Sequence, residues 1–360
     1  MSTTALNDLF RHPIVQAPMA GGASCPELVG AVCEAGALGF LAAGYKTAGG
    51  LYQEIKRVRG LTSRPFGVNL FMPQGGPHAD PAAVEVYRHQ LAGEATWYET
   101  SLGEADDCRD DGYDAKLAIL LDDPVRVVSF TFGCPAPETL AAFARAGTFT
   151  LVTVTSAEDA VAAERAGADA VCVQGAEAGG HQSTYRDDPA DDGTPGTGLL
   201  ALVTQVRESV ALPVVATGGI MRGAQIAAAL AAGADAAMLG TAFLGCPESG
   251  AHPLHKRALT DPLFTRTAFT RAFSGRPARG LVNRFMREHG PYAPAAYPEV
   301  HHPTAPLRKA AATSGDAQGM ALWAGQGHRL ARELPAGQLV EVLAAELDTA
   351  LSDLAHRSAS

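Results

Sequence analysis

A glycine-rich segment that ends in a histidine, Gly175–His181, is the part of the sequence best suited to chemistry on a bound ligand. It follows an apolar run, residues 169–173, of the kind that forms a buried strand in a parallel sheet. Gly179 and Gly180 would let the backbone approach a ligand closely, with amide groups free to donate hydrogen bonds. His181 would then stand at the mouth of a cavity. The alternative is a glycine-rich turn that carries a solvated histidine.

Eight apolar runs along the chain have the composition of buried strands. They lie at residues 13–19, 38–43, 66–71, 125–132, 148–155, 169–173, 213–217 and 236–240. Helical patterns separate them, such as residues 25–35, where Ser24 is the expected N-cap and Pro26 lies in the first turn. Strands that alternate with helices favour a parallel sheet. We therefore predict an α/β fold, a (β/α)8 TIM barrel with ligand-face insertions and a C-terminal helical extension; a doubly wound open sheet is the alternative.

Two alanine-rich segments, residues 157–170 and 224–236, share one pattern, in which a helix ends at glycine and is followed by Ala-Asp-Ala and an apolar strand. This repeated unit is the building block of a barrel. We expect residues 10–245 to form the barrel, with an insertion at about 73–124, and residues 246–360 to add loops and helices that complete the ligand-binding face. The last helix is predicted at residues 338–354, with Leu351 and Leu354 on its apolar face.

Composition and charge argue against several classes of function. Of 360 residues, 47% are hydrophobic and 18% charged, and the net charge of −10 argues against a nucleic-acid or anionic-membrane partner. Six cysteines form no CxxC pair and the histidines do not cluster at metal-ligand spacing, so we expect reduced cysteines and no metal site. We see neither the pattern of a signal peptide nor that of a membrane span, and expect a cytoplasmic protein.

The carboxyl ends of the predicted strands bring the candidate site residues together, because the active sites of barrels lie at this end. Thr217-Gly218-Gly219 follows the seventh strand and Gly240-Thr241 follows the eighth. Barrels often bind a phosphate at these two places through backbone amides. Either group alone could be a structural turn, but their joint position favours phosphate binding.

Asn69 and Gln174 place amide side chains at the ends of two otherwise apolar strands. A buried amide must be hydrogen-bonded. The partner is either neighbouring backbone or the edge of a ligand such as an isoalloxazine or pyrimidine ring, and the sequence leaves both open. No Ser-His-Asp arrangement or pair of carboxylates stands out.

With these residues collected, the sequence resembles the nitronate monooxygenases, a flavoprotein family once called 2-nitropropane dioxygenases, in its class I-like form. The matching motifs lie at residues 16–22, 67–71, 128–133, 174–181, 216–220, 240–243, 273–279, 314–316 and 323–326. They extend over about residues 10–330, which is nearly the whole chain.

The resemblance implies an enzyme with non-covalently bound FMN that oxidises alkyl nitronates, such as propionate 3-nitronate, with O2 to a carbonyl compound and nitrite. It implies that His181 is the catalytic residue, which takes a proton from the carbon next to a nitro group or pairs with the anionic nitronate. It implies no metal and allows for a homodimer. The implied cofactor contacts are Ala17, Pro18, Met19, Asn69, Gln174, Gly179, Gly180, Gly218, Gly219, Met238, Leu239, Gly240 and Thr241.

Two positions depart from the family pattern. Relatives often have a second histidine where this chain has Thr131. Threonine can be neither a cation nor a base here, so recognition of the substrate's charge is expected to differ. Met238 stands where many relatives have glutamine, which would leave only backbone contacts to FMN at that position.

Three alternatives stay open. An FMN-dependent enoyl-[acyl-carrier-protein] reductase, or another NAD(P)H-linked flavin oxidoreductase, would share the barrel and the flavin loops. A barrel that binds a phosphorylated ligand without redox chemistry is the second. In the third, the physiological substrate is a biosynthetic nitro or keto compound, and nitronate oxidation is a side activity.

Overall fold

Eight parallel strands close into a barrel in the computed structural model, which describes residues 5–74, 79–104, 110–187 and 196–359. The strands are β1 (Ile14–Gln16), β2 (Leu38–Ala42), β3 (Gly67–Phe71), β4 (Val127–Thr131), β5 (Phe149–Val154), β6 (Ala170–Gln174), β8 (Val214–Thr217) and β9 (Ala236–Leu239). Val15 of β1 pairs with Leu38 of β2 on one side and with Met238 of β9 on the other, so the sheet has no open edge. The predicted (β/α)8 barrel is confirmed, and the open-sheet alternative is wrong.

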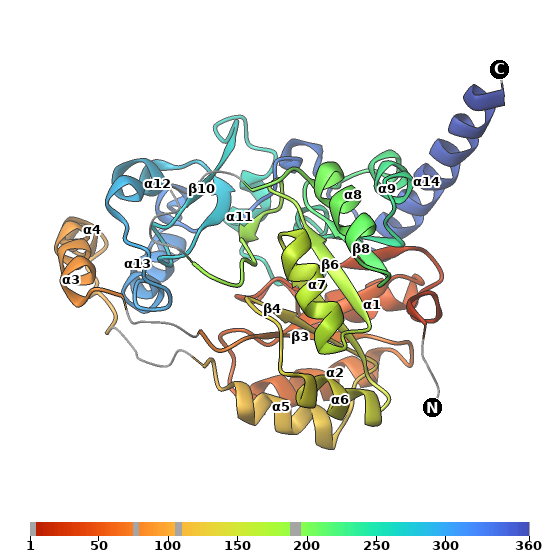
Figure 1. The fold of residues 1–360 in the computed structure, drawn as a ribbon. Coiled ribbons are helices and arrows are strands. Elements are labelled where there is room, and N and C mark those ends of the chain that lie inside the picture. The colour runs from red at the N-terminus through yellow and green to blue at the C-terminus, as the bar shows by residue number, and fades with distance from the viewer. Residues whose placement is uncertain (1–4, 75–78, 105–109, 188–195, 360) are drawn as a thin grey trace.

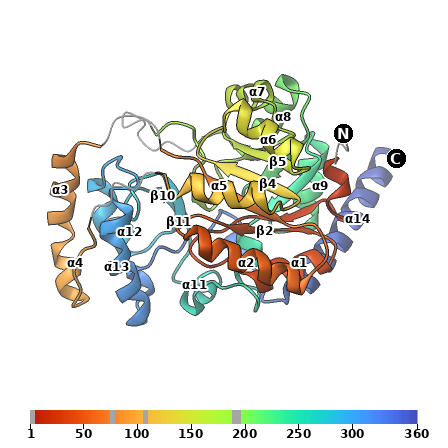
Figure 2. The same ribbon diagram turned by 90° about the horizontal axis from the view of Figure 1, so that it is seen from below.

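In the described residues, one helix after each strand packs on the outside of the barrel (Figures 1 and 2). These helices are α1 (Pro26–Glu34), α2 (Ala48–Leu61), α5 (Tyr113–Asp122), α6 (Pro137–Arg145), α7 (Ala157–Ala166), α8 (Leu199–Ser209), α9 (Gly223–Ala231) and α14 (Ala336–Ala359). Since α14 packs against both α9 and α1, it completes the ring, although residues 240–335 separate it from β9.

The N-terminus of α1 corrects one prediction. Pro26 begins the helix as expected, but the N-cap residue is Cys25 and not Ser24. The Ser24 hydroxyl instead accepts a hydrogen bond of 2.8 Å from the backbone N–H of Met19. Ser24 therefore stabilises the loop after β1 and not the helix end.

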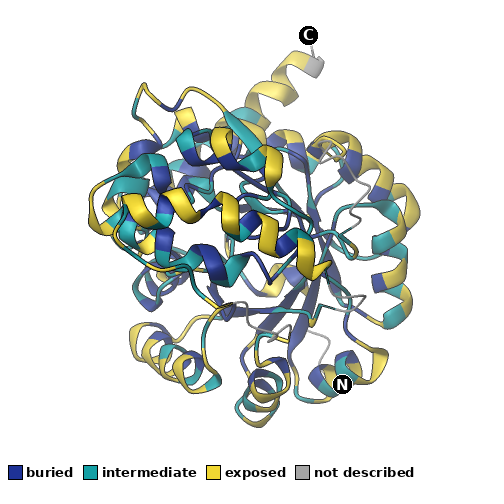
Figure 3. Cartoon of the chain, turned by 90° about the vertical axis from the view of Figure 1, so that its left-hand side faces the viewer, coloured by how far each residue is buried: buried dark blue, intermediate teal, exposed yellow. Residues whose placement is uncertain are grey.

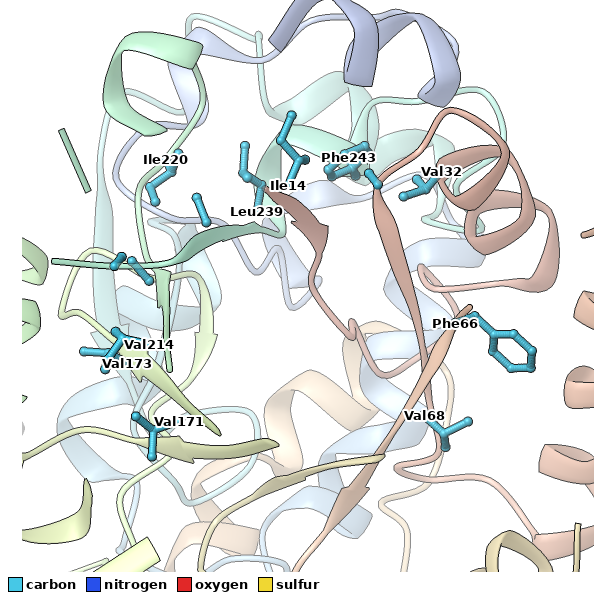
Figure 4. Close-up of a cluster of buried hydrophobic side chains, with 14 of the residues drawn as sticks. Ile14, Val32, Phe66, Val68, Val171, Val173, Val214, Ile220, Leu239 and Phe243 are labelled. Carbon is cyan, nitrogen blue, oxygen red and sulfur yellow. The ribbon is translucent and has the colours of Figure 1, made fainter. Parts of the chain in front are cut away.

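The barrel strands are buried on both faces, which explains their continuous apolar runs. Inward-pointing side chains such as Phe40, Leu151 and Val215 fill the barrel interior, and a short 3-10 helix, η1 (Leu6–Asp8), packs Leu6 against them. Figure 4 shows the outer layer, in which side chains such as Val68 point from the strands toward the helices. Exposed residues lie mainly on the outer faces of the helices (Figure 3).

The insertion between β3 and α5 and the segment after β9 together form a cover beside the barrel. The insertion contains α3 (Pro81–Gln90) and α4 (Ala92–Trp97), and the later segment contains α10 (Thr241–Leu244), α11 (Pro253–Ala258), α12 (Arg284–His289), η2 (Gly290–Tyr292), α13 (His301–Thr313), η3 (Ala317–Gly319) and η4 (His328–Leu330). Tyr87 of α3 packs in one apolar cluster with Phe273 and Phe285, so the two parts of the cover form a joint core. The domain limits expected from the sequence stay a prediction, and residues 75–78 and 105–109 of the insertion lie outside the described residues.

A three-stranded sheet lies in this cover. β10 (Thr267–Thr270) pairs antiparallel with β11 (Ala278–Leu281), which pairs antiparallel with β7 (Gly180–His181). Residues 246–360, which were expected to add loops and helices, also contain two short strands, β10 and β11. The strands are short and the connection between β10 and β11 contains glycine and proline, which favours a loop in the sequence. His181 lies directly opposite Ala278 in this sheet.

The last helix, α14, extends beyond the predicted residues 338–354. Leu339, Leu343 and Leu347 of the predicted apolar face are buried, whereas Leu351 and Leu354 at its end are exposed. The end of the helix extends away from the barrel (Figure 1), where no described element covers it. No helix in the described part of the chain is long and apolar enough to cross a membrane.

Candidate active site

The carboxyl ends of the barrel strands open into a cavity of about 520 Å³. All the site residues expected from the sequence line this cavity: His181, Ala17, Pro18, Met19, Asn69, Gln174, Gly179, Gly180, Gly218, Gly219, Met238, Leu239, Gly240 and Thr241. They come from the ends of β1, β3, β6, β8 and β9 and from β7. The structure brings these residues together, while the individual roles assigned to them stay predictions.

Contacts on several sides hold the imidazole of His181 at the cavity wall. Its Nε2 lies 2.8 Å from Oγ of Ser274, and its backbone carbonyl accepts a hydrogen bond of 3.0 Å from the Gln174 side chain. Its ring centroid lies 5.6 Å from that of Trp323 and 5.9 Å from that of Phe132. The ring therefore has little freedom to turn away from the cavity.

His181 is uncharged at neutral pH. Burial, and after it the positive charges of Arg276 and Arg308, lower the pKa of the imidazole to about 3. The Ser274 hydroxyl also lies 3.3 Å from the backbone carbonyl of Arg276. When the hydroxyl donates to this carbonyl, it accepts the Nε2 proton of His181, and Nδ1 keeps a free lone pair. In that arrangement the imidazole can accept a proton from a ligand.

Arg276 is a buried cation that connects three loops around the site. Its side chain is 1% exposed and donates to the backbone carbonyls of Gln182 and Thr184 and to Oε1 of Gln74. The guanidinium carbon lies 4.1 Å from the centre of the Phe132 ring. Burial lowers the pKa of Arg276 to about 10, so the group stays protonated at neutral pH. A fixed positive charge therefore lies beside the cavity without lining it.

Arg308 of α13 is the only lysine or arginine that lines the cavity in the described part of the chain. Its Nη2 donates to the carbonyl of His301 at 2.8 Å, and its Nη1 makes no hydrogen bond to the described residues. Burial and the charge of Arg308 lower the pKa of His301 to about 2, so His301 adds no charge. The ring of His301 stacks on Tyr45 with 4.2 Å between centroids. The cavity thus offers one cationic group with an unused donor.

Close approaches require glycine at two positions of the site, Gly219 and Gly179. Gly219 has a φ of +68°, and a Cβ there would lie 2.9 Å from Cβ of Glu177. A Cβ on Gly179 would lie 2.5 Å from the backbone nitrogen of Gly325. Both distances are shorter than side chains tolerate, so these positions exclude larger residues. At Gly179 the neighbour that requires glycine is the protein backbone, in addition to any ligand.

The two amides expected at the strand ends have different surroundings. Oε1 of Gln174 accepts from the backbone N–H of Ser183 at 2.8 Å, and its Nε2 donates to His181, so this amide mainly stabilises the loop that carries the histidine. Oδ1 of Asn69 accepts from side-chain hydroxyls, while its Nδ2 makes no hydrogen bond to the described residues. Asn69 therefore presents an unused donor to the cavity that it lines.

The positions that depart from the family pattern also lie in the site. Thr131 lines the cavity and donates to Oδ1 of Asn69, and the same cavity is lined by the cation Arg308 of α13. The Met238 sulfur lies 3.7 Å from the Cys172 sulfur at the barrel interior, and its carbonyl accepts from the Thr217 hydroxyl.

Arg308, His301 and Tyr45 also line the site but were not predicted from the sequence. Arg308 and His301 are seven positions apart on α13, so two helical turns bring them to the same face, and this spacing was an available signal. Nothing in the local sequence connects them with Tyr45, which follows β2.

Known proteins resemble this chain over nearly its whole length. The sequence model of the nitronate monooxygenases matches residues 3–346. A nitronate monooxygenase from Paraburkholderia phytofirmans is 40% identical over 351 residues, which cover 95% of this chain and 94% of the relative. The chain belongs to the nitronate monooxygenase family.

Solved structures agree with this assignment. The nitroalkane oxidase from Streptomyces ansochromogenes is 73% identical, with a TM-score of 0.95 and coverage of 98% of this chain and 100% of that chain. FabK from Thermotoga maritima is 28% identical, with a TM-score of 0.73 and coverage of 98% of both chains. As a member of the nitronate monooxygenase family, the protein is a flavin-dependent oxidoreductase.

Proposed function

We propose that the cavity binds FMN and that the enzyme uses O2 to convert alkyl nitronates, such as propionate 3-nitronate, into carbonyl compounds and nitrite. One observation carries the proposal: an uncharged imidazole, His181, lines the same cavity as the cation Arg308, which has an unused donor. A nitronate is a small anion, so it requires a positive partner in a site from which water is largely excluded.

The residues of the cavity suit FMN in three respects. A volume of about 520 Å³ lies within the range of cofactor sites. The glycines after β8 and β9 leave backbone amides uncovered where barrels hold phosphates, and Gly218 and Gly219 have φ values of +133° and +68°. Nδ2 of Asn69 offers a donor to the acceptor atoms on the pyrimidine edge of a flavin ring. A bound flavin supplies the electron-accepting chemistry that none of these side chains provides.

Arg308 and His181 would divide the handling of the substrate. Arg308 binds the oxygen atoms of the nitronate by a charge-assisted hydrogen bond from Nη1. His181, held by Ser274 and Trp323, contacts the carbon side of the substrate and keeps its orientation. The neighbouring aromatic side chains of Phe132 and Trp323 exclude water from the reacting carbon.

Neutral nitroalkanes are a second candidate substrate, which the similarity to a nitroalkane oxidase favours. His181 would take the proton from the carbon next to the nitro group. With a pKa of about 3 the imidazole is a weak base in the empty cavity. The anion formed beside it changes this, because an opposite charge at ~4 Å contributes about 4 kcal/mol at an effective dielectric constant of ~20, or roughly three pKa units. The pKa of the imidazole would then rise to about 6, so the imidazolium can form in the reaction and release its proton again at neutral pH.

Oxygen uptake by the flavin-loaded enzyme tests the proposal. We expect O2 consumption and nitrite release with propionate 3-nitronate and no requirement for NAD(P)H. An enzyme that consumes NAD(P)H with an enoyl thioester and ignores nitronates would instead be a reductase. A protein that stays colourless after addition of FMN would be a binder of another phosphorylated ligand. The proposal also includes a cytoplasmic location, no nucleic-acid or membrane partner, and a homodimer as the assembly to be tested by light scattering.

A further inference from the structure

We infer that Ser129 and Thr131 lock the amide of Asn69 with its Nδ2 toward the cavity, which makes Thr131 a positioning residue for the bound flavin. The inference rests on the proposed FMN site and adds a role for the residue that stands where relatives often have a second histidine.

Both hydroxyls bond to the same oxygen atom. Oγ of Ser129 donates to Oδ1 of Asn69 at 2.8 Å, and Oγ1 of Thr131 donates to it at 2.9 Å. Asn69 and Ser129 are paired residues of β3 and β4, and Thr131 lies two positions further along β4, so its side chain is on the same face. Asn69 is 2% and Ser129 1% exposed, so water does not replace the bond between these two residues, while Thr131 is partly exposed where it lines the cavity.

The number of hydroxyl protons decides the orientation of the amide. Oδ1 has two lone pairs, and each accepts one hydroxyl proton. An amide turned by 180° would donate its two N–H groups to the hydroxyl oxygens and leave both hydroxyl protons without a partner among the described residues. Unsatisfied buried donors are costly, so the pair of hydroxyls holds Oδ1 toward β4 and Nδ2 toward the cavity. One hydroxyl alone would hold the amide less firmly.

Gln174 cannot donate to the flavin in place of Asn69, because its amide is bonded to the backbone of His181 and Ser183. Asn69 is therefore the side-chain amide of the cavity with both N–H groups available. A donor beside the pyrimidine edge of a flavin favours the reduced form, which carries more negative charge there. The lock should consequently affect both the affinity for FMN and the midpoint potential of the bound flavin.

Titration of the apoprotein with FMN tests the affinity. Thr131→Val keeps the shape of the side chain and removes the hydroxyl, while Thr131→Ser keeps the hydroxyl and is the matched control. We expect Thr131→Ser to bind like the wild type, Thr131→Val to bind about threefold more weakly, and the double variant Ser129→Ala/Thr131→Val about 10- to 100-fold more weakly, with a lower midpoint potential. An unchanged dissociation constant and potential in the double variant would overturn the inference.

A second measurement needs no flavin. The chain contains only three asparagines, Asn7, Asn69 and Asn283, so selective 15N labelling gives three side-chain NH2 signals. Replacing both hydroxyls should shift or broaden the Asn69 signal of the apoprotein and leave the other two unchanged. If the Asn69 signal has the same shift and width in the double variant, the two hydroxyls do not hold the amide, whether or not FMN binds. Failure of the wild type to bind FMN would instead contradict the proposed cofactor, and the NMR result would still decide the lock.

Discussion

His181 lies between a serine hydroxyl, two guanidinium groups and several aromatic rings, and no carboxylate among the described residues bonds to it. Such surroundings remove a proton from the imidazole and favour an anion as its neighbour. At the scale of single residues, the site is therefore built to receive negative charge and to hold or accept one proton.

Replacing His181 by asparagine separates these two tasks. The variant should still bind FMN, because the glycine loops and Asn69 are unchanged, but turnover of neutral nitroalkanes should fall by about 10²- to 10⁴-fold through loss of the base. Preformed nitronate needs no proton abstraction and should keep a larger share of its rate. The ratio of the two rates is measured by O2 uptake and serves as an internal control for folding. Equal losses with both substrates would contradict the assignment of a base.

Replacing Arg308 tests the recognition of the anion. Arg308→Met should raise the KM for nitronate by about 10- to 100-fold, the effect of losing one hydrogen bond to a charged group. Arg308→Lys keeps the charge and should recover most of the affinity. The KM for a neutral nitroalkane should change less, because the neutral substrate forms no ion pair with Arg308. An Arg308→Met enzyme with an unchanged KM for nitronate would show that another group binds the anion.

The sequence predicted His181, the glycine loops and Asn69 because each is part of a local pattern at the end of an apolar strand. Arg308 and Arg276 could not be predicted in this way. Both come from the segment after β9, and only the fold brings them near a histidine that lies far earlier in the chain. The role that we infer for Thr131 also appears only when β3 and β4 are placed side by side.

At the scale of elements, the strands were predictable to within a few residues because both of their faces are buried, which leaves continuous apolar runs in the sequence. The sheet of β7, β10 and β11 was not, because its pairing joins residues 180–181 to residues 278–281 and leaves no periodic pattern. The contact of α14 with α1 is equally long-range, and the chain between β9 and α14 hides the fact that this helix completes the barrel.

A pair of glycine substitutions tests the place of α14. A Cβ on Gly223, the first residue of α9, would lie 2.2 Å from the backbone nitrogen of Leu347, so Gly223→Ala should force the two helices apart and destabilise the protein by about 1–3 kcal/mol. A Cβ on Gly49 of α2 would have no atom within 4 Å, so Gly49→Ala should stabilise the protein by about 0.5–1 kcal/mol. Thermal unfolding compares the variants. Equal melting temperatures would contradict the close packing of α9 against α14.

At the scale of the whole molecule, three histidines that line the cavity, His181, His255 and His301, connect stability with pH. Burial is the largest cause that lowers the pKa of His181 to about 3, of His301 to about 2 and of His255 to about 4. All three take up protons near pH 6.5 in the unfolded chain. Between pH 6.5 and about 4 the unfolded state therefore binds more protons than the folded state, and stability falls as the pH falls. Above pH 6.5 these groups give no pH dependence.

Thermal unfolding of the apoprotein from pH 8 to pH 4.5 measures this effect. The melting temperature should be nearly constant from pH 8 to pH 7 and then decrease, because unfolding takes up as many as three protons below pH 6.5. A variant with glutamine at all three positions should decrease less over the same range. Hydrogen bonds from Arg284 and His289 help to lower the pKa of Glu94 to about 2. The contribution of Glu94 to stability is therefore lost only below pH 4.5 and does not obscure the result. A wild-type melting temperature that stays constant from pH 8 to pH 5 would contradict the uncharged state of these histidines.

The central claim is that this barrel holds a flavin which nitronates reduce directly. The measurement that tests it first is a visible absorption spectrum of the purified protein, followed by anaerobic addition of propionate 3-nitronate. We predict bands at about 370 and 450 nm, as oxidised flavins show, and a loss of the band at the longer wavelength on addition of nitronate without NAD(P)H. A flavin spectrum that nitronate leaves unchanged, and that only NAD(P)H bleaches, would contradict the claim.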